Sequence, residues 1–305
     1  MRETGSSQPG TRCALVSLAL LLGCHGLRAA HPAPEPPAGP ATAEELITFV
    51  DRAAAELQAK GNAAFGEFGR EGSEWKHGDT YVFVVDAATH RVLFHGHDPA
   101  RVGEDLTTIR GAEGRAFGRW GVQGLAGSRD RAWIFYKRAR PRGGAPTWKA
   151  TFLRRVQGPS GERYIVGSGL YDLVPDRRFV VELVDMAAER IERDGRAALA
   201  LVRDPKGPFV YRDTQVFVID TKGNVLADPF YPELERKNQI DLKDAAGRPI
   251  QRDLVHLVQT EEAGWRTGYL WPRPRGGAPG HKDLYVRRVR LGKQTLGVGS
   301  GLFVE

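Results

Sequence analysis

The chain has 305 residues, which is enough for two domains of about 150 residues each. Hydrophobic residues make up 41% and charged residues 27%, so a collagen-like or mostly disordered chain is excluded. The net charge of +7 comes from arginines spread along the chain rather than from a basic block, and it does not indicate nucleic-acid binding. Both cysteines, Cys13 and Cys24, lie near the N-terminus, which excludes cysteine proteases, CxxC redox enzymes and zinc fingers.

Residues 1–23 have the pattern of a signal peptide. Two arginines precede an apolar run at 14–23, which suits a signal-peptide core and is too short to span a bilayer. The run ends in the letters LLGC, which resemble a bacterial lipobox, so we expect cleavage before Cys24 and lipidation of its thiol. The alternative is an ordinary secretory signal that is cut near Ala29 or Ala30, where the small-residue rule is poorly met.

Residues 24–42 are predicted to be a tether. The letters HPAPEPPAGPA at 31–41 favour extended polyproline II, because proline blocks helix and ladder hydrogen bonds. No later stretch approaches 18 uninterrupted apolar residues, so no transmembrane helix is expected after the signal. We therefore expect a periplasmic or cell-envelope protein anchored to a membrane by Cys24, or a secreted protein if the ordinary signal is used.

The rest of the chain is predicted to be an internal duplication. Three pairs of segments match at shifts of 134, 134 and 133 residues: 50–65 with 184–199, 80–86 with 214–220, and 138–156 with 271–289. The last pair shares 11 identities in 19 positions. A repeat of this length is too long for a solenoid unit and long enough for a domain. We predict two homologous domains, at 43–175 and 176–305.

Each copy is predicted to have the same α+β plan, which is a helix of five to six turns, two strands, a loop with a short helix, and three further strands. In the second copy we expect strands and a helix at 215–220, 224–228, 251–260 (the helix), 267–271, 283–289 and 295–303. Consecutive strands joined by short turns imply an antiparallel sheet.

The second copy resembles a single Cache domain of type 2 over nearly all of 178–305. The resemblance rests on the segments 207–209, 217–220, 223–229, 241–249, 268–272, 282–286 and 299–303. The first copy is similar but departs from the pattern, because Arg138, Phe152 and Gly111 stand at the positions of Trp271, Tyr285 and Asp244.

The resemblance implies a tandem of PAS-like extracytoplasmic sensor domains, each with a long N-terminal helix and an antiparallel sheet. Such domains bind small molecules, often carboxylates or amino acids, and are usually fused to a chemoreceptor, kinase or cyclase. No transmitter segment follows the second copy in this sequence, so we expect a separate membrane receptor or kinase as partner.

Four side chains of the second copy are candidates for a ligand pocket. Alternation along a strand places Tyr269 and Trp271 on one face, as an aromatic wall with a phenol donor. Lys282 could pair with a ligand carboxylate, and Tyr285 could donate a second hydrogen bond. These two residues are an odd number apart, so we expect Lys282 in the preceding loop or a bulge between them. The alternatives are core packing for the aromatic residues and a solvated loop charge for Lys282.

The first copy retains a cation, Lys149, at the position of Lys282, but it lacks Trp271 and Tyr285. We therefore expect binding mainly in the second copy. If the ligand is an amine, Asp228 and the face of Trp271 would bind it instead, through charge and cation–π contact.

Other patterns point less directly to chemistry. His95, His97 and Asp98 could bind zinc or copper, but the second copy has no counterpart, which favours an ordinary loop. Ser168 and Ser300 lack the GxSxG elbow, and no Walker loop is present. We expect no catalytic residue, no metal and no cofactor.

The sequence thus predicts a non-enzymatic, exported and lipid-anchored sensor that binds an organic acid or a similar metabolite. The first alternative is a structural or scaffolding lipoprotein whose Cache folds form an interaction surface. The second is a metal-dependent enzyme that uses His95 and His97. We further expect a homodimer through the long N-terminal helices, and no nucleic-acid partner.

Overall fold

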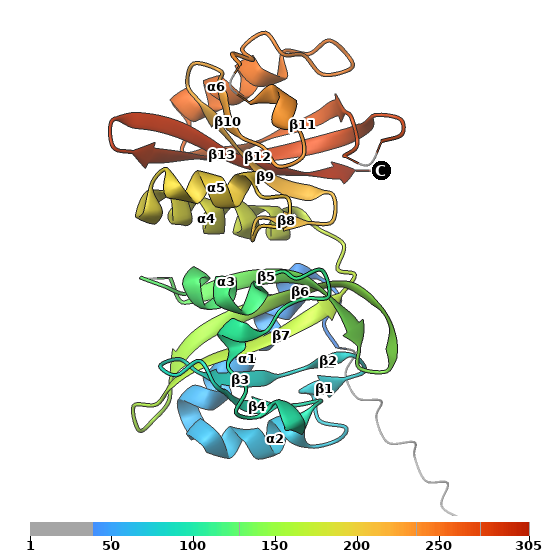
Figure 1. The fold of residues 1–305 in the computed structure, drawn as a ribbon, viewed down its shortest axis with the longest axis vertical. Coiled ribbons are helices and arrows are strands. Elements are labelled where there is room, and N and C mark those ends of the chain that lie inside the picture. The colour runs from blue at the N-terminus through green and yellow to red at the C-terminus, as the bar shows by residue number, and fades with distance from the viewer. Residues whose placement is uncertain (1–38, 128, 236, 275, 305) are drawn as a thin grey trace, which may run out of the picture. The chain divides into compact units, whose positions relative to one another are not determined.

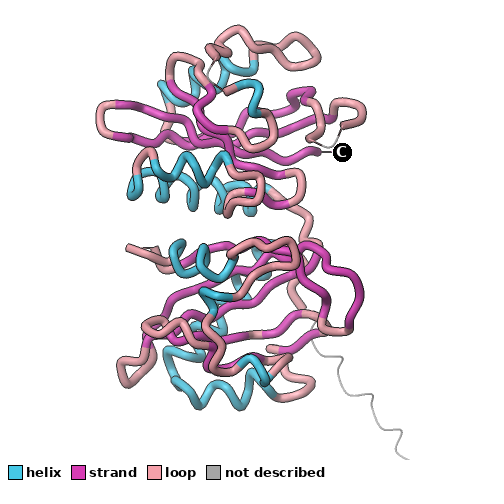
Figure 2. The backbone as a smooth tube through the Cα atoms, viewed as in Figure 1, coloured by secondary structure: helices cyan, strands magenta, loops and turns pink. Residues whose placement is uncertain are grey.

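The computed structural model describes residues 39–304 except 128, 236 and 275. The predicted signal peptide, Cys24 and most of the tether lie outside the described residues. The described chain holds helices and antiparallel sheets in two similar halves, so the predicted α+β class is confirmed (Figures 1 and 2).

The first half begins with the long helix α1. Its further elements are short helices and seven strands: α1 (Ala43–Lys60), η1 (Gly61–Ala64), α2 (Phe65–Gly69), β1 (Lys76–His77), β2 (Thr80–Tyr81), β3 (Phe83–Asp86), β4 (Val92–His95), η2 (Pro99–Arg101), η3 (Leu106–Thr108), α3 (Phe117–Gly124), β5 (Arg131–Arg140), β6 (Gly143–Gln157) and β7 (Arg163–Tyr171). The main sheet has the order β4-β3-β7-β6-β5, and every pair in it is antiparallel.

The second half repeats this plan from α4 onward. Its elements are α4 (Arg177–Asp194), α5 (Ala197–Arg203), β8 (Val210–Tyr211), β9 (Thr214–Asp220), β10 (Val225–Ala227), η4 (Pro232–Leu234), α6 (Ile250–Thr260), β11 (Ala263–Trp271), β12 (Gly280–Leu291) and β13 (Gln294–Val304). The sheet order β10-β9-β13-β12-β11 corresponds strand for strand to that of the first half.

The two long helices begin and end in the same way. Thr42 accepts a hydrogen bond from the Glu45 backbone N–H, and Glu45 accepts one from the Thr42 N–H, which forms a capping box. Asp176 caps α4 by accepting from the backbone N–H of Phe179 at 2.8 Å. Each helix ends at a glycine with positive φ, 54° at Gly61 and 64° at Gly195, where a side chain would be strained.

Each sheet is covered on both faces. In the first half α1 packs on β6 and β7, and α3 packs against β5. In the second half α4 packs on β12 and β13, and α6 packs on the opposite face. Neighbouring residues of one strand enter different apolar clusters, as Val218 on the α4 side and Ile219 on the α6 side do. The α6 side of the second sheet also forms one wall of a pocket.

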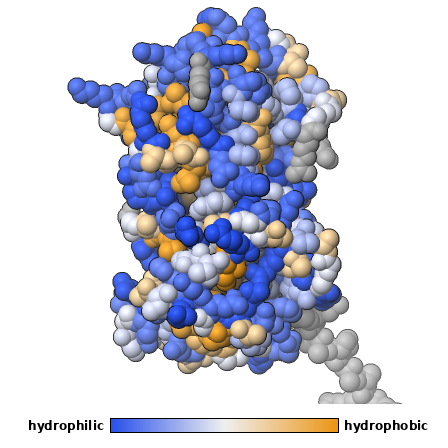
Figure 3. Space-filling view, viewed as in Figure 1, coloured by the Kyte–Doolittle hydropathy of each residue, from blue (hydrophilic) through white to orange (hydrophobic). Residues whose placement is uncertain are grey.

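The face shown in Figure 3 is mostly hydrophilic, with apolar side chains scattered over it. Among the described residues, the exposed large apolar side chains are Val102 and Val174. No helix in the part of the chain that is described has the length and the apolar character needed to cross a bilayer.

Candidate functional site

A small cavity of about 50 Å³ lies on the α6 side of the second sheet. Its lining comes from β9, the segment after β10, α6, β11 and β12, and consists of Gln215, Phe217, Ile219, Val225, Asp228, Tyr231, Leu234, Leu242, Ile250, Gln251, Leu254, Trp271, Lys282 and Leu284. One water needs about 10 to 15 Å³ on this scale, so the cavity suits a molecule of about four or five non-hydrogen atoms. The cavity thus has the concave, mostly apolar character of a small-molecule site.

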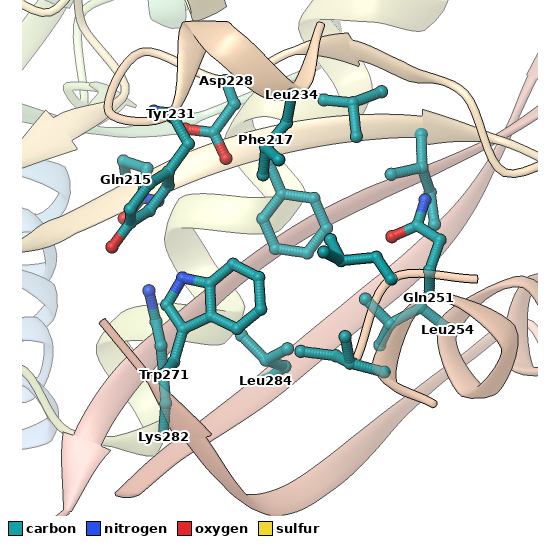
Figure 4. A pocket seen from close by; sticks show the side chains of 14 residues that line it. Gln215, Phe217, Asp228, Tyr231, Leu234, Gln251, Leu254, Trp271, Lys282 and Leu284 are labelled. Carbon is teal, nitrogen blue, oxygen red and sulfur yellow. Dashed lines mark hydrogen bonds between the residues drawn. The ribbon is translucent and has the colours of Figure 1, made fainter. Parts of the chain in front are cut away.

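The pocket has a polar end and an apolar end. Figure 4 shows Lys282, Asp228, Gln215 and Tyr231 grouped at one end, with Leu254 and Gln251 toward the other. The Gln251 amide donates to the Gly223 carbonyl at 3.3 Å, so that end carries no charged group. A ligand with one charged group and a short apolar part would match this division.

Lys282 reaches the pocket from a regular strand. It lies within β12 and pairs with Phe303, and the pairing with β13 continues without a break through Tyr285 and Ser300. The expectation that Lys282 lies in a loop, or that a bulge separates it from Tyr285, is therefore wrong. The register shift lies in the neighbouring strand β11, between Arg266 and Tyr269.

Because β12 is regular, Tyr285 lies on the opposite face from Lys282. Its ring packs 5.3 Å from that of Trp265, in the apolar cluster on the α4 side. Tyr285 is therefore not part of the pocket lining, and the predicted second donor is not placed at this site.

Tyr269 is also used elsewhere. It pairs with Lys282 across β11 and β12, but its hydroxyl donates to the Asp253 carboxylate on α6 at 2.7 Å. The Arg248 guanidinium lies 4.8 Å from the centre of its ring. The phenol therefore fixes α6 to the sheet, and of the predicted aromatic wall only Trp271 lines the cavity.

The Lys282 ammonium is buried and forms no ion pair in the part of the chain that the structure describes. Its residue is 3% exposed, and burial lowers its pKa to about 8, an effect that Asp228 and Asp213 partly oppose. Within the described residues it forms neither an ion pair nor a hydrogen bond, and its nitrogen lies 4.9 Å from the centre of the Phe303 ring. A buried charge in this state is unfavourable unless something else compensates it.

Asp228 is the acid of the polar end. One of its carboxylate oxygens accepts hydrogen bonds from the backbone N–H groups of Phe230 at 2.9 Å and Tyr231 at 3.2 Å. Burial raises its pKa to about 6, against these hydrogen bonds and the attraction of Lys282. At pH 7 the ionised forms of Asp228 and Lys282 both predominate, so the polar end is close to neutral overall.

Three polar residues of the pocket lining, Gln215, Tyr231 and Gln251, were not predicted. Gln215 is 2% exposed, and its carbonyl oxygen has no hydrogen-bond partner in the described part of the chain. Tyr231 donates its hydroxyl to the Pro272 carbonyl at 2.6 Å, and its ring meets Trp271 edge-on at 5.8 Å. Alternation along the predicted strand at 215–220 could have indicated Gln215 beside Phe217, but Tyr231 lies in a loop that has no periodicity.

A smaller cavity, of about 30 Å³, occupies the corresponding place in the first half. Lys149 pairs with Tyr136 there, as Lys282 pairs with Tyr269. Its ammonium lies 3.3 Å from the Tyr81 hydroxyl, and burial lowers its pKa to about 7. Lys149 thus holds the same place in its sheet as Lys282.

The histidine pattern does not form a metal centre. His95 lines the smaller cavity, and its Nδ1 accepts the backbone N–H of Asp98 at 2.9 Å. His97 lies with its ring 5.7 Å from that of Tyr81. Among residues 39–304, apart from the gaps given above, no group of three or more His, Cys, Asp or Glu is placed to hold a metal ion.

Several solved structures are similar to parts of this chain. A Cache chemosensory domain, solved for its recognition of carboxylic acids, is 22% identical over 42% of this chain and 92% of its own, with a TM-score of 0.36. A methyl-accepting chemotaxis protein from Vibrio parahaemolyticus is 20% identical over 42% of this chain and 88% of its own (TM-score 0.35). The ligand-binding domain of an amino acid chemoreceptor of Pseudomonas aeruginosa, in complex with GABA, is 12% identical over 85% of this chain and 90% of its own (TM-score 0.31).

A search of curated proteins gave no match. The family described as Single Cache domain 2 matches residues 193–302, a range that includes the whole lining of the larger pocket. The match does not extend to the first copy, for which the resemblance stays a prediction. Residues 193–302 are therefore similar to a single Cache domain of type 2.

Proposed function

We propose that this protein is an extracytoplasmic sensor that binds a small carboxylate in the pocket of its second half. The observation that carries the proposal is the Lys282 ammonium, which is buried at the polar end of the cavity and forms no ion pair within the described residues, so that the attraction of Asp228 offsets its burial only in part. A ligand carboxylate would compensate this charge with a charge-assisted hydrogen bond. The unpaired carbonyl oxygen of Gln215 would accept a donor from the ligand or from a bound water.

The size and shape of the pocket support a short ligand. Room for about four or five non-hydrogen atoms corresponds to acetate or propionate. The alkyl part would lie against Phe217, Trp271 and Leu284, whose burial against an apolar chain is favourable. Asp228 stands at the same end and would reject a dianion by repulsion, so the proposal is a monocarboxylate.

Thermal unfolding of the purified protein with acetate, propionate, acetamide and propylamine tests this proposal. We expect the carboxylates to raise the Tm, and the neutral isostere acetamide to have little effect because it lacks the charge. Lys282→Met should abolish the carboxylate effect, whereas the exposed control Lys293→Met should retain it. The proposal is wrong if acetamide stabilises as well as acetate, or if Lys282→Met still responds. A response to propylamine alone would assign the site to Asp228 and Trp271 instead.

The context of the pocket is part of the proposal. We propose that Cys24 is lipidated, that residues 43–175 and 176–305 are two Cache-like domains, and that a separate membrane protein reads the bound state. The corresponding strand orders of the two halves support the division into domains. Labelling with a lipid precursor tests the anchor, since Cys24→Ser should lose the label and leave the membrane fraction. A mature N-terminus at Ala30 without label would contradict it.

A further inference from the structure

The cavity of the first half has a different charge from that of the second. Its lining contains three cationic residues, Arg101, Arg138 and Lys149, and no aspartate or glutamate. The remaining lining is aromatic and aliphatic apart from His95. The first-half pocket therefore differs from the second-half pocket in which Asp228 faces Lys282.

One position accounts for the missing acid. Val92 of β4 pairs with Val85 of β3, and Val225 of β10 pairs with Ile219 of β9, at equivalent places in the two sheets. His95 and Asp228 each lie three residues further along the chain, so they occupy corresponding positions. Burial and nearby cations lower the pKa of His95 to about 3, so its imidazole is neutral at pH 7. The first half thus has an uncharged ring where the second half has a carboxylate.

Two of the three cations have no acidic partner among the described residues. Arg101 is compensated, because it forms ion pairs with Asp98 at 3.1 Å and Glu104 at 3.0 Å. Lys149 is 3% exposed and reaches only the neutral Tyr81 hydroxyl, and Arg138 forms no ion pair and no side-chain hydrogen bond in the described chain. Asp79 opposes the effect of burial on Lys149, but it forms an ion pair with Arg140 at 2.9 Å, so within the described chain neither Lys149 nor Arg138 has an acidic residue of its own.

The rings around Lys149 do not supply that negative charge. Its ammonium lies 4.4 Å from the centre of the Tyr81 ring and 4.6 Å from that of Tyr171, which gives cation–π stabilisation. Burial raises the pKa of both phenols, so both are neutral at pH 7. The aromatic faces hold the ammonium in place but leave its charge available to an anion.

The apolar end of this pocket is already filled. Phe117 of α3 and Tyr136 of β5 stack at 3.7 Å between ring centres, with an angle of 11°. The remaining volume of about 30 Å³ corresponds to two or three water-sized groups. An alkyl chain therefore does not fit, and a compact anion does.

We propose that the first half binds a small planar oxyanion of a single negative charge between Lys149 and Arg138. The planar guanidinium of Arg138 suits the two oxygens of such an anion, and Lys149 acts as a point charge beside it. Formate has this chemistry and three non-hydrogen atoms, and nitrate and bicarbonate share the chemistry with one atom more. The inference is independent of carboxylate binding in the second half, because it rests on other residues in another cavity.

Calorimetric titration of the full-length protein with formate, nitrate and bicarbonate tests this inference, with chloride at equal ionic strength as the blank. We expect at least one of the three anions to bind with a stoichiometry of one. Arg138→Gln should weaken binding by about tenfold, the energy of one charge-assisted hydrogen bond. The matched control Arg142→Gln, an exposed arginine of the same hairpin, should bind as the wild type does.

Two further variants locate the anion. His95→Asp places a carboxylate at the position of Asp228, where it would compete for Lys149, so binding should be lost. Lys282→Met removes the cation of the other pocket and should leave anion binding unchanged, which separates this inference from the proposed function. The inference is overturned if none of the anions binds the wild type, or if Arg138→Gln and His95→Asp bind as tightly as the wild type. Loss of binding in Lys282→Met alone would place the anion in the second half.

Discussion

We expect the buried ammonium of Lys282 to destabilise the folded protein when no anion compensates its charge. Its pKa falls from the usual 10.5 to about 8 because burial disfavours the charged form. This difference corresponds to about 3 kcal/mol of unfolding free energy. Methionine has a similar length and no charge, so Lys282→Met should stabilise the protein without its ligand by up to about that amount at pH 7. The same change should remove the response to carboxylates.

The size of this effect depends on pH in a defined way. Below pH 8 the ammonium is protonated in both the folded and the unfolded state, and the full penalty is present. Between pH 8 and 10.5 the unfolded chain binds more protons at this lysine than the folded chain does. The free energy of unfolding of the wild type therefore rises with pH over this range. The difference between Lys282→Met and the wild type should therefore shrink over this range and vanish above it.

Asp228 limits the gain in the single variant. Removing Lys282 leaves the buried Asp228 carboxylate without the cation that partly offsets its burial. The double variant Lys282→Met/Asp228→Asn removes both charges and should show the larger stabilisation.

Urea unfolding followed by tryptophan fluorescence and circular dichroism at pH 7 and pH 10 measures these differences. Lys293→Met, on the exposed turn after β12, is the control for the gain of a methionine. A double variant that is less stable than the wild type at pH 7 would refute the reasoning, because Lys282 would then be held by net favourable contacts such as that with Phe303.

The remaining predictions concern three other features. Tyr269→Phe should leave carboxylate affinity unchanged and lower the unfolding free energy by about 1 to 2 kcal/mol, because Asp253 loses its donor; titration and urea unfolding check this. Anion binding in the first half should take up protons near pH 7 and weaken about tenfold from pH 6 to pH 8, since Lys149 has a pKa of about 7; titration in two buffers of different ionisation enthalpy checks it. The predicted domains 43–175 and 176–305 should fold as separate fragments, and a disordered second fragment by circular dichroism would contradict this.

Much of the fold follows from periodicity in the sequence. The helix expected at 251–260 is α6 (Ile250–Thr260), and the strand expected at 295–303 is β13 (Gln294–Val304). The buried residues of α6 recur with the period of a helix, and β13 has a continuous run of buried residues at 296–301; local sequence indicates both patterns. The strand expected at 283–289 extends to Gly280, because backbone pairing with β11 and β13 decides where it begins. That extension places Lys282 in the sheet.

The site was harder to predict than the fold. Alternation along a strand correctly indicated that Lys282 and Tyr285 face opposite sides of the sheet. The prediction nevertheless placed both residues at the ligand, because it assumed a loop or a bulge between them. The bulge is in β11, and the sequence of β12 contains no signal of what its neighbour does. Tyr231 reaches the pocket from a loop, where neither the helix period nor the strand period of the sequence applies. Asp228 was expected to contact the ligand only if the ligand is an amine.

The comparison of the two halves indicates how one fold can hold two pockets of different charge. Tyr136 and Tyr269 pair with Lys149 and Lys282 in the same register, so the sheets place each buried cation alike. What differs lies at the ends of strands, where His95 replaces Asp228 and Arg138 replaces Trp271. A strand end can change its side chain without loss of ladder hydrogen bonds or of the central core, so these positions are free to alter the charge of the pocket. The chemistry of each half is therefore set by a few terminal positions around a lysine that the sheet itself fixes.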